Sequence, residues 1–176
     1  MIQIVKQPID EAALLESVRD PRCGAVVLFV GTTRQFTAGQ ETRKLVYECF
    51  ETMASKELGR LRDEALERWP IVHCAIVHRV GTVPLSESSI AVAVSSPHRP
   101  EAFQAAQWLM DQIKKSVPIW KQEHGPDGTQ QWIHPGVETE KQAATAASVA
   151  PSGDRSLSDS DSPANSPPTT GRSPSP

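Results

Sequence analysis

The feature that most restricts how this chain can fold is a strand-like segment followed at once by a helix-like segment. Residues 89–95 read S-I-A-V-A-V-S, an alternation typical of a buried strand. Pro100 then opens a segment that Pro118 closes, because proline suits the first turn of a helix and disrupts its interior. Between the two prolines, apolar residues recur at steps of three and four and predict one buried helical face, made of Phe103, Ala106, Met110, Ile113 and Val117.

Cationic residues stand at both ends of this predicted helix. His98 and Arg99 come just before its first turn, where backbone N–H groups, the helix dipole and the forked Arg donor favour an anion. Lys114 falls near its end and Lys121 just beyond it, where packing of residues 119–120 is expected to hold the Lys121 stem. Each pair also has a plain explanation: a solvated surface pair at the start, and lysines that complement the helix dipole at the end.

The rest of the chain alternates predicted strands and helices without an internal repeat, which indicates an α+β (mixed α/β) fold. The run 24–31 is continuously apolar and bounded by glycines, as expected of a central strand; it leads to Arg34 and a polar loop over residues 35–43. The other predicted strands cover residues 2–5, 44–50, 71–80 and 131–133, and the other predicted helices cover residues 9–18, with Asp10 as N-cap, and 52–69, with Thr52 as N-cap.

The composition changes sharply near Gly136. Residues 138–176 contain nine Ser and six Pro and no aromatic residue, so they cannot bury enough apolar surface to offset the entropy of ordering, and we expect a disordered tail. Residues 1–137 suit a single domain with one core. Within the tail, residues 158–163 read S-D-S-D-S-P and offer phosphate acceptors, although a plain solvated tail is the preferred explanation.

Charge, cysteine usage and hydropathy narrow the class of protein. Residues 1–137 carry 15 basic and 16 acidic side chains, so they lack the broad basic footprint of a nucleic-acid-binding domain. Three widely spaced cysteines with no C-x-x-C pair are typical of buried free thiols in a reducing compartment. No signal sequence is visible and no apolar segment reaches the roughly 18 residues of a membrane span, so we expect a cytosolic protein with no membrane partner.

The histidines show no H-x-x-x-H or H-E-x-x-H spacing, which argues against a metal site. Among them, His73 and His78 fall within a predicted strand, and we interpret them as structural. What remains is one anion site, built from Arg34 and from the cations at the two ends of the helix. Residue chemistry alone leaves open whether this site is catalytic or belongs to a non-catalytic module that binds an anion or a partner's C-terminal tail.

Four segments resemble the large (catalytic) subunit of molybdopterin synthase. They are GAVVLFVGTTR (24–34), ERWPIVHCAIVHRVG (67–81), SSPHRPEAFQAAQWLMDQIKKSVPIWKQE (95–123) and the closing pair Gln131-Trp132. The resemblance implies an α/β hammerhead-like fold and a homodimer that binds a small ubiquitin-like subunit at each end, giving a heterotetramer. It also implies a sulfurtransferase of molybdenum cofactor biosynthesis. The C-terminal Gly-Gly thiocarboxylate of the small subunit supplies the sulfur, and cyclic pyranopterin monophosphate becomes molybdopterin without a metal or another cofactor.

Carried over to this sequence, the resemblance assigns the catalytic roles to Lys114 and Lys121. It assigns substrate binding to Arg34, His98, Arg99, Lys114, Lys121, Gln122 and Glu123. Two departures from the pattern stand out: residue 122 is Gln where many relatives carry a basic residue, and residues 133–136 lack the basic residue that some relatives supply across the dimer.

Overall fold

The fold is known from a computed structural model, which describes residues 1–37 and 39–133. Along the described chain, the elements are β1 (Ile2–Val5), α1 (Glu11–Ser17), β2 (Ala25–Thr32), β3 (Phe36–Thr37), β4 (Gln40–Glu41), β5 (Lys44–Cys49), α2 (Glu51–Arg68), β6 (His73–Arg79), β7 (Gly81–Pro84), β8 (Ser88–Ser96), α3 (Arg99–Ser116), β9 (Ile119–His124) and β10 (Gln130–Ile133). No helix in the described part of the chain is long and apolar enough to cross a membrane.

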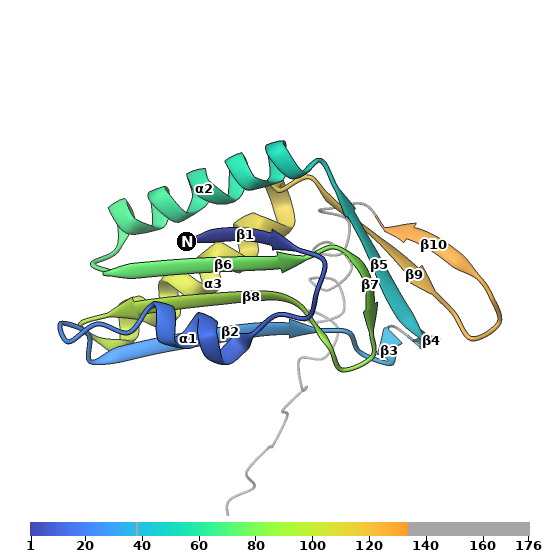
Figure 1. The fold of residues 1–176 in the computed structure, drawn as a ribbon, viewed down its shortest axis with the longest axis horizontal. Helices are drawn as coiled ribbons and strands as arrows, with labels where there is room; N and C mark the ends of the chain where they lie inside the picture. The colour runs from blue at the N-terminus through green and yellow to red at the C-terminus, as the bar shows by residue number, and fades with distance from the viewer. Residues whose placement is uncertain (38, 134–176) are drawn as a thin grey trace, which may run out of the picture.

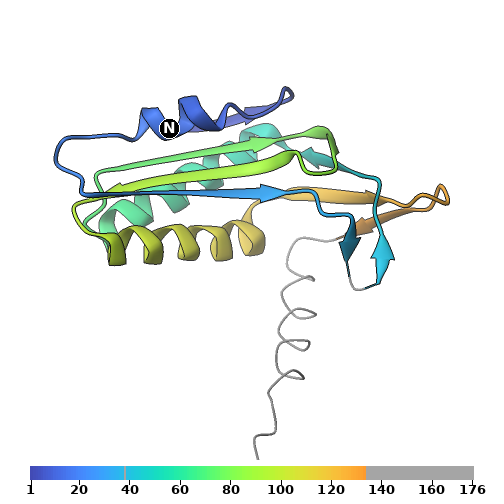
Figure 2. The same cartoon turned by 90° about the horizontal axis from the view of Figure 1, so that it is seen from below.

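The main sheet has the strand order β1-β6-β8-β2, with β1 parallel to β6 and the other pairs antiparallel. All nine residues of β8 are buried, because this strand lies inside the sheet and both faces of the sheet are covered. Helices α2 and α3 cover one face and the short α1 lies against the other (Figure 2). A sheet covered on both sides reads as continuously apolar in sequence, which is why the run in β8 lacks polar residues at its centre.

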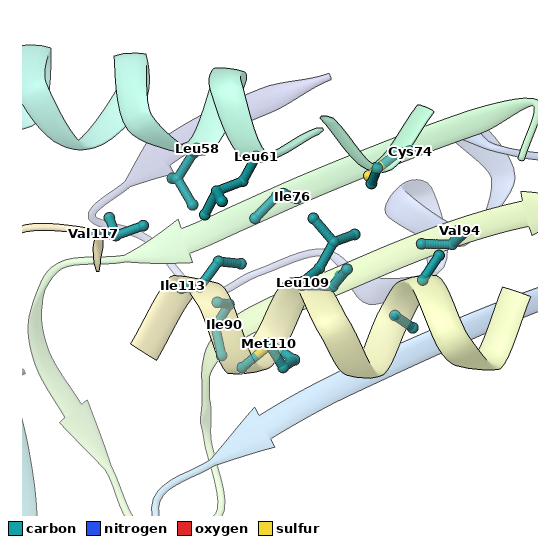
Figure 3. Packing of buried hydrophobic residues seen from close by; sticks show 14 of the residues in the cluster. Leu58, Leu61, Cys74, Ile76, Ile90, Val94, Leu109, Met110, Ile113 and Val117 are labelled. Atoms are coloured by element: carbon teal, nitrogen blue, oxygen red, sulfur yellow. The ribbon is translucent and has the colours of Figure 1, made fainter. Parts of the chain in front are cut away.

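The larger core lies between the main sheet and the helix pair α2 and α3. Leu58 and Leu61 of α2 meet Leu109 and Ile113 of α3 above Ile76 of β6 (Figure 3). Leu58, Leu61, Ile76 and Leu109 have no exposed surface. Burying side chains of this size stabilises the fold by roughly 1.5–3 kcal/mol each before entropy is subtracted, so this layer fixes where both helices lie.

A second sheet, with the antiparallel order β10-β9-β5-β7, extends past the end of the main sheet (Figure 1). Two of the short connections that lead into it are sharp bends. One is Gly81, whose φ of 80° lets the chain turn from β6 directly into β7. The other is Pro118, which ends α3 and lets the chain continue as β9. These two bends place the second sheet against the C-terminal end of α3.

The structure confirms most of the predicted elements, including the Asp10 cap, whose side chain accepts a hydrogen bond from the Ala13 N–H. The central position predicted for the run 24–31 is wrong. This run forms β2 at the edge of the sheet, with Val26 and Phe29 exposed by 37% and 40%. Apolar composition does not distinguish an edge strand whose outer side chains are apolar from a central one.

Three smaller predictions are also corrected. Phe103 is 63% exposed, because α3 packs through Ala102 and Ala105, whose small side chains allow close approach to the sheet. Thr52 does not cap α2: the helix starts at Glu51 and its N-cap position makes no side-chain hydrogen bond. The polar loop 35–43 contains the β3–β4 hairpin. The predicted boundary at residue 137 and the tail 138–176 lie outside the described residues.

Candidate active site

A pocket of about 250 Å³ lies where the end of the main sheet, the C-terminal end of α3 and the second sheet meet. Strand ends and the helix end supply both polar and apolar walls. The polar residues that line it are Thr32, Arg34, Thr37, Thr42, Tyr47, His78, Ser89, Lys114, Lys121 and Glu123, and the apolar ones include Phe29, Leu45, Met110, Ile113 and Ile119.

Lys114 and Lys121 reach this pocket from the two sides of the Pro118 bend. The helix closes with a hydrogen bond from the Val117 N–H to the Ile113 carbonyl, and β9 starts at Ile119. Strand alternation then places Ile119, Lys121 and Glu123 on the same face of β9, which is the pocket face. The bend at Pro118 thus returns Lys121 towards Lys114, since both lysines line one pocket.

Glu123 forms an ion pair with one of the two lysines. The Lys121 Nζ lies 3.1 Å from the Glu123 Oε1, and their side chains are 17% and 15% exposed. A pair so largely removed from solvent is stronger than a surface pair, and it holds the ammonium group in one place. Among the described residues that line the pocket, three cations face one carboxylate, so positive charge is in excess.

Arg34 lies two residues after β2 and is held by the hairpin that follows it. Its Nε donates a hydrogen bond to the Thr37 Oγ1 at 3.0 Å, and the Thr42 N–H donates to the Gln35 carbonyl at 2.7 Å. These bonds fix the backbone on both sides of the β3–β4 hairpin and leave most of the guanidinium donors available. The pocket therefore combines a forked donor on a loop with two ammonium groups.

His98 and Arg99 do not line this pocket. His98 is the N-cap residue of α3 and Arg99 its first residue, at the opposite end of the helix from Lys114. Arg99 and Lys114 are 15 residues apart in this helix, and a rise of about 1.5 Å per residue separates their backbones by roughly 22 Å. One chain therefore does not bring the two ends of α3 into the same site.

Gln122 also lies away from the pocket, on the opposite face of β9. Its Oε1 is 2.9 Å from the Nε2 of His124, which is two residues along on that same face. Of the seven predicted site residues, the pocket thus brings together Arg34, Lys114, Lys121 and Glu123.

Among the polar residues of the pocket that sequence reasoning missed are Tyr47, His78 and Ser89. They come from β5, β6 and β8. His78 is 5% exposed, and burial lowers the pKa of its imidazole to about 4, so the ring is neutral at pH 7. The signal in the sequence was a polar side chain inside an otherwise apolar strand, which also fits a structural histidine.

Comparison with known proteins shows to which family the chain belongs. The family model described as MoaE protein matches residues 4–116, which is more than half of the chain. The chain belongs to the MoaE protein family. A member from Halalkalibacterium halodurans, named molybdopterin synthase catalytic subunit, is 39% identical over 136 residues, covering 77% of this chain and 86% of that protein. A protein of the same name from Culex quinquefasciatus is 44% identical over 128 residues, covering 72% and 82%.

Solved structures of MoaE proteins share this fold. The crystal structure of molybdopterin synthase from Staphylococcus aureus aligns with a TM-score of 0.71 and 40% sequence identity, covering 74% of this chain and 95% of that one. The MoaE protein from Burkholderia ambifaria aligns with a TM-score of 0.67 and 32% identity, covering 85% and 98%. The predicted family and the predicted mixed α/β fold are both confirmed.

Proposed function

We propose that this chain is the catalytic subunit of a molybdopterin synthase and acts as a sulfurtransferase in molybdenum cofactor biosynthesis. Relatives that are about 40% identical over most of the chain are named molybdopterin synthase catalytic subunit. The observation that carries the proposal for the site is the meeting of Lys114, Lys121 and Arg34 in one pocket with an apolar wall. The substrate is cyclic pyranopterin monophosphate, and sulfur comes from the C-terminal thiocarboxylate of a small ubiquitin-like subunit that ends in Gly-Gly.

The three cations of the pocket differ in chemistry and have different roles. Arg34 offers a planar fork of donors, which suits the cyclic phosphate. Lys114 and Lys121 line the same pocket beside apolar residues, and their positive charge stabilises the thiocarboxylate and the oxyanions that form as sulfur attacks. They also move protons during the attack and the opening of the phosphate ring. Glu123 holds the Lys121 ammonium group during two successive transfers. No metal or further cofactor takes part.

His98 and Arg99 join the site from a second copy of the chain. Within one chain the length of α3 keeps them roughly 22 Å from the lysine end. A two-fold dimer places the N-terminal end of one α3 near the C-terminal end of the other when the helices run antiparallel across the axis. In that arrangement, each pocket combines its own lysines with the partner copy's anion-binding helix start. Gln122, on the outer face of β9, acts indirectly, through its side-chain contact with His124 of the same strand.

The small subunit delivers its tail to the pocket, and two catalytic chains with two small subunits form the heterotetramer. A solved structure with the same fold, from Helicobacter pylori, is described as a complex of subunits 1 and 2 of molybdopterin-converting factor. We place the whole assembly in the cytosol, where free cysteines such as Cys23, Cys49 and Cys74 stay reduced.

Replacement of Lys121 tests this function. Lys121→Ala is expected to abolish formation of the dithiolene product in a reaction reconstituted with the thiocarboxylated partner and the cyclic precursor. Lys115→Ala is the matched control, because Lys115 lies in the same region of the chain, is exposed and does not line the pocket. Near-normal turnover by Lys121→Ala, with the dimer intact, would show that the lysine is not catalytic. Retained binding of the precursor with no product from the wild type would favour a non-catalytic anion-binding module.

A further inference from the structure

Arg79, the last residue of β6, is a buried cation that does not line the pocket described above. Its side chain is only 9% exposed. Its Nη1 donates to the Glu87 Oε2 in an ion pair, and its Nη2 donates to the Thr82 carbonyl at 3.0 Å. Among the described residues its Nε has no hydrogen-bond partner, so these two contacts compensate the buried charge. Arg79 thereby ties Glu87 to the neighbouring strand β7.

Residues 84–87 form the tight turn from β7 into β8, and the backbone of this turn is strained. The Glu87 N–H closes the turn by donating to the Pro84 carbonyl at 3.3 Å. Among the described residues other than glycine, Ser86 alone has a positive φ, of 65°. This left-handed conformation is disfavoured for a residue with a side chain. The turn therefore depends on contacts outside itself to keep its shape, and the ion pair with Arg79 is one of them.

The turn in its own place holds Thr33, the residue just before Arg34. The Thr33 N–H donates to the Glu87 carbonyl at 3.0 Å, and the Ser86 N–H donates to the Thr33 carbonyl at 2.8 Å. At the same point the register between β2 and β8 shifts, so the regular ladder does not continue towards Arg34. An irregularity of this kind redirects the side chains that follow it. The two bonds to the turn therefore fix the direction in which Arg34 leaves the sheet.

We propose that the Arg79–Glu87 ion pair positions Arg34 for the anionic part of its ligand. The ion pair fixes the turn 84–87, and the turn holds the backbone of Thr33 on both sides. Neither member of the ion pair lines the pocket, so both are positioning residues that act through Arg34. The inference rests on the function proposed above, because it assigns a support to the residue that binds the cyclic phosphate there.

The direction of Arg34 matters because a guanidinium binds a phosphate through two parallel N–H···O bonds, which need a defined alignment. A second support comes from the β3–β4 hairpin, where the Arg34 Nε donates to the Thr37 Oγ1. Loss of the ion pair should therefore misalign the fork without removing it from the pocket. We expect weaker binding of the phosphate-bearing precursor and little change in the turnover number, since the lysines stay in place.

Glu87→Ala tests the ion pair, because it removes the carboxylate and keeps the main chain of the turn. With the full-length protein, the dissociation constant of the cyclic precursor should rise about fivefold, against roughly thirtyfold for Arg34→Ala. Glu87→Gln keeps an acceptor for Arg79 and should weaken binding only about twofold. Glu64→Ala is the matched control: its carboxylate is 42% exposed, against 43% for Glu87, and pairs with Arg60 on the surface of α2.

Two further measurements separate positioning from a loss of stability. The double variant Arg34→Ala/Glu87→Ala should bind the precursor no more weakly than Arg34→Ala alone, because the side chain through which Glu87 acts is then missing. Hydrogen exchange followed by NMR should show the Thr33 and Ser86 amides exchanging about tenfold faster in Glu87→Ala, while amides in the centre of β8 keep their protection. This second readout does not depend on any substrate.

Unchanged exchange of the Thr33 and Ser86 amides would overturn the proposal, because the ion pair would then not hold the turn. Faster exchange with unchanged precursor affinity would overturn it too, by limiting the ion pair to a role in stability. Losses that add in the double variant would show that Glu87 does not act through Arg34. The same outcomes are decisive for Glu87→Gln if Glu87→Ala does not fold. Full precursor affinity in Arg34→Ala would refute the phosphate contact in the proposed function, and this inference with it, whatever the exchange result.

Discussion

The separation of the two ends of α3 makes a quantitative prediction about shared active sites. Arg99→Ala and Lys121→Ala should each give an inactive homodimer, because every site then lacks one member. In a dimer with one copy of each variant, one site combines the intact Lys121 of the first chain with the intact Arg99 of the second. The other site lacks both. Random pairing of equal amounts makes about half of the dimers mixed, so about a quarter of all sites should be intact.

The assay is product formation after the two variants are co-expressed or unfolded and refolded together. The expected activity is about 25% of wild type per site, against near-zero activity for either variant alone or for the two mixed without subunit exchange. The need for two chains follows from the distance of roughly 22 Å between Arg99 and Lys114 along one helix. No recovery after exchange would refute a site made from two chains. It would mean that the helix start and the lysines serve one chain only, or that the helix start serves no site.

Two further predictions concern stability. Because the pKa of His78 falls from 6.5 to about 4 on folding, the unfolded chain takes up its proton first as the pH drops. The contribution of His78 to the free energy of unfolding should therefore be fully present above pH 7, fall by about 2 kcal/mol between pH 7 and pH 5, and level off below pH 4. Denaturant titrations that show no such loss would contradict the burial of His78. Leu109→Ala, at a fully buried site, should lower the free energy of unfolding by about 3 kcal/mol, whereas Leu66→Ala, at a site 37% exposed, should lower it by less than about 1 kcal/mol. Equal losses would contradict the packing of α3.

Local sequence features correctly predicted the course of the main chain around the site. Pro100 and Pro118 set the limits of α3 to within a residue or two, and the second proline placed the bend that brings Lys121 back to Lys114. These features depend on the covalent restriction of proline and on helical periodicity, which act over a few residues. The meeting of the two lysines in one site was implied by the family resemblance, because residue chemistry alone also explained them as lysines that complement the helix dipole.

What could not be predicted depends on which element lies beside which. The apolar run of β2 looks the same at the edge of a sheet as at its centre, and Phe103 fits the period of α3 although alanines make the close contact. Tyr47 and His78 come from strands that are distant in sequence, so their position in one pocket can be seen only once β5 and β6 are in place. The resemblance named His98 and Arg99 without showing that a single chain keeps them apart from the lysines.

The most direct test of sulfur transfer compares two forms of the small partner. The purified protein is mixed with cyclic pyranopterin monophosphate and with a partner whose C-terminal Gly-Gly ends either in a thiocarboxylate or in an ordinary carboxylate. The account predicts dithiolene product with the thiocarboxylate alone, and two thiocarboxylates consumed for each molybdopterin formed. No product with the thiocarboxylated partner, under conditions in which the protein binds both partner and precursor, would contradict it.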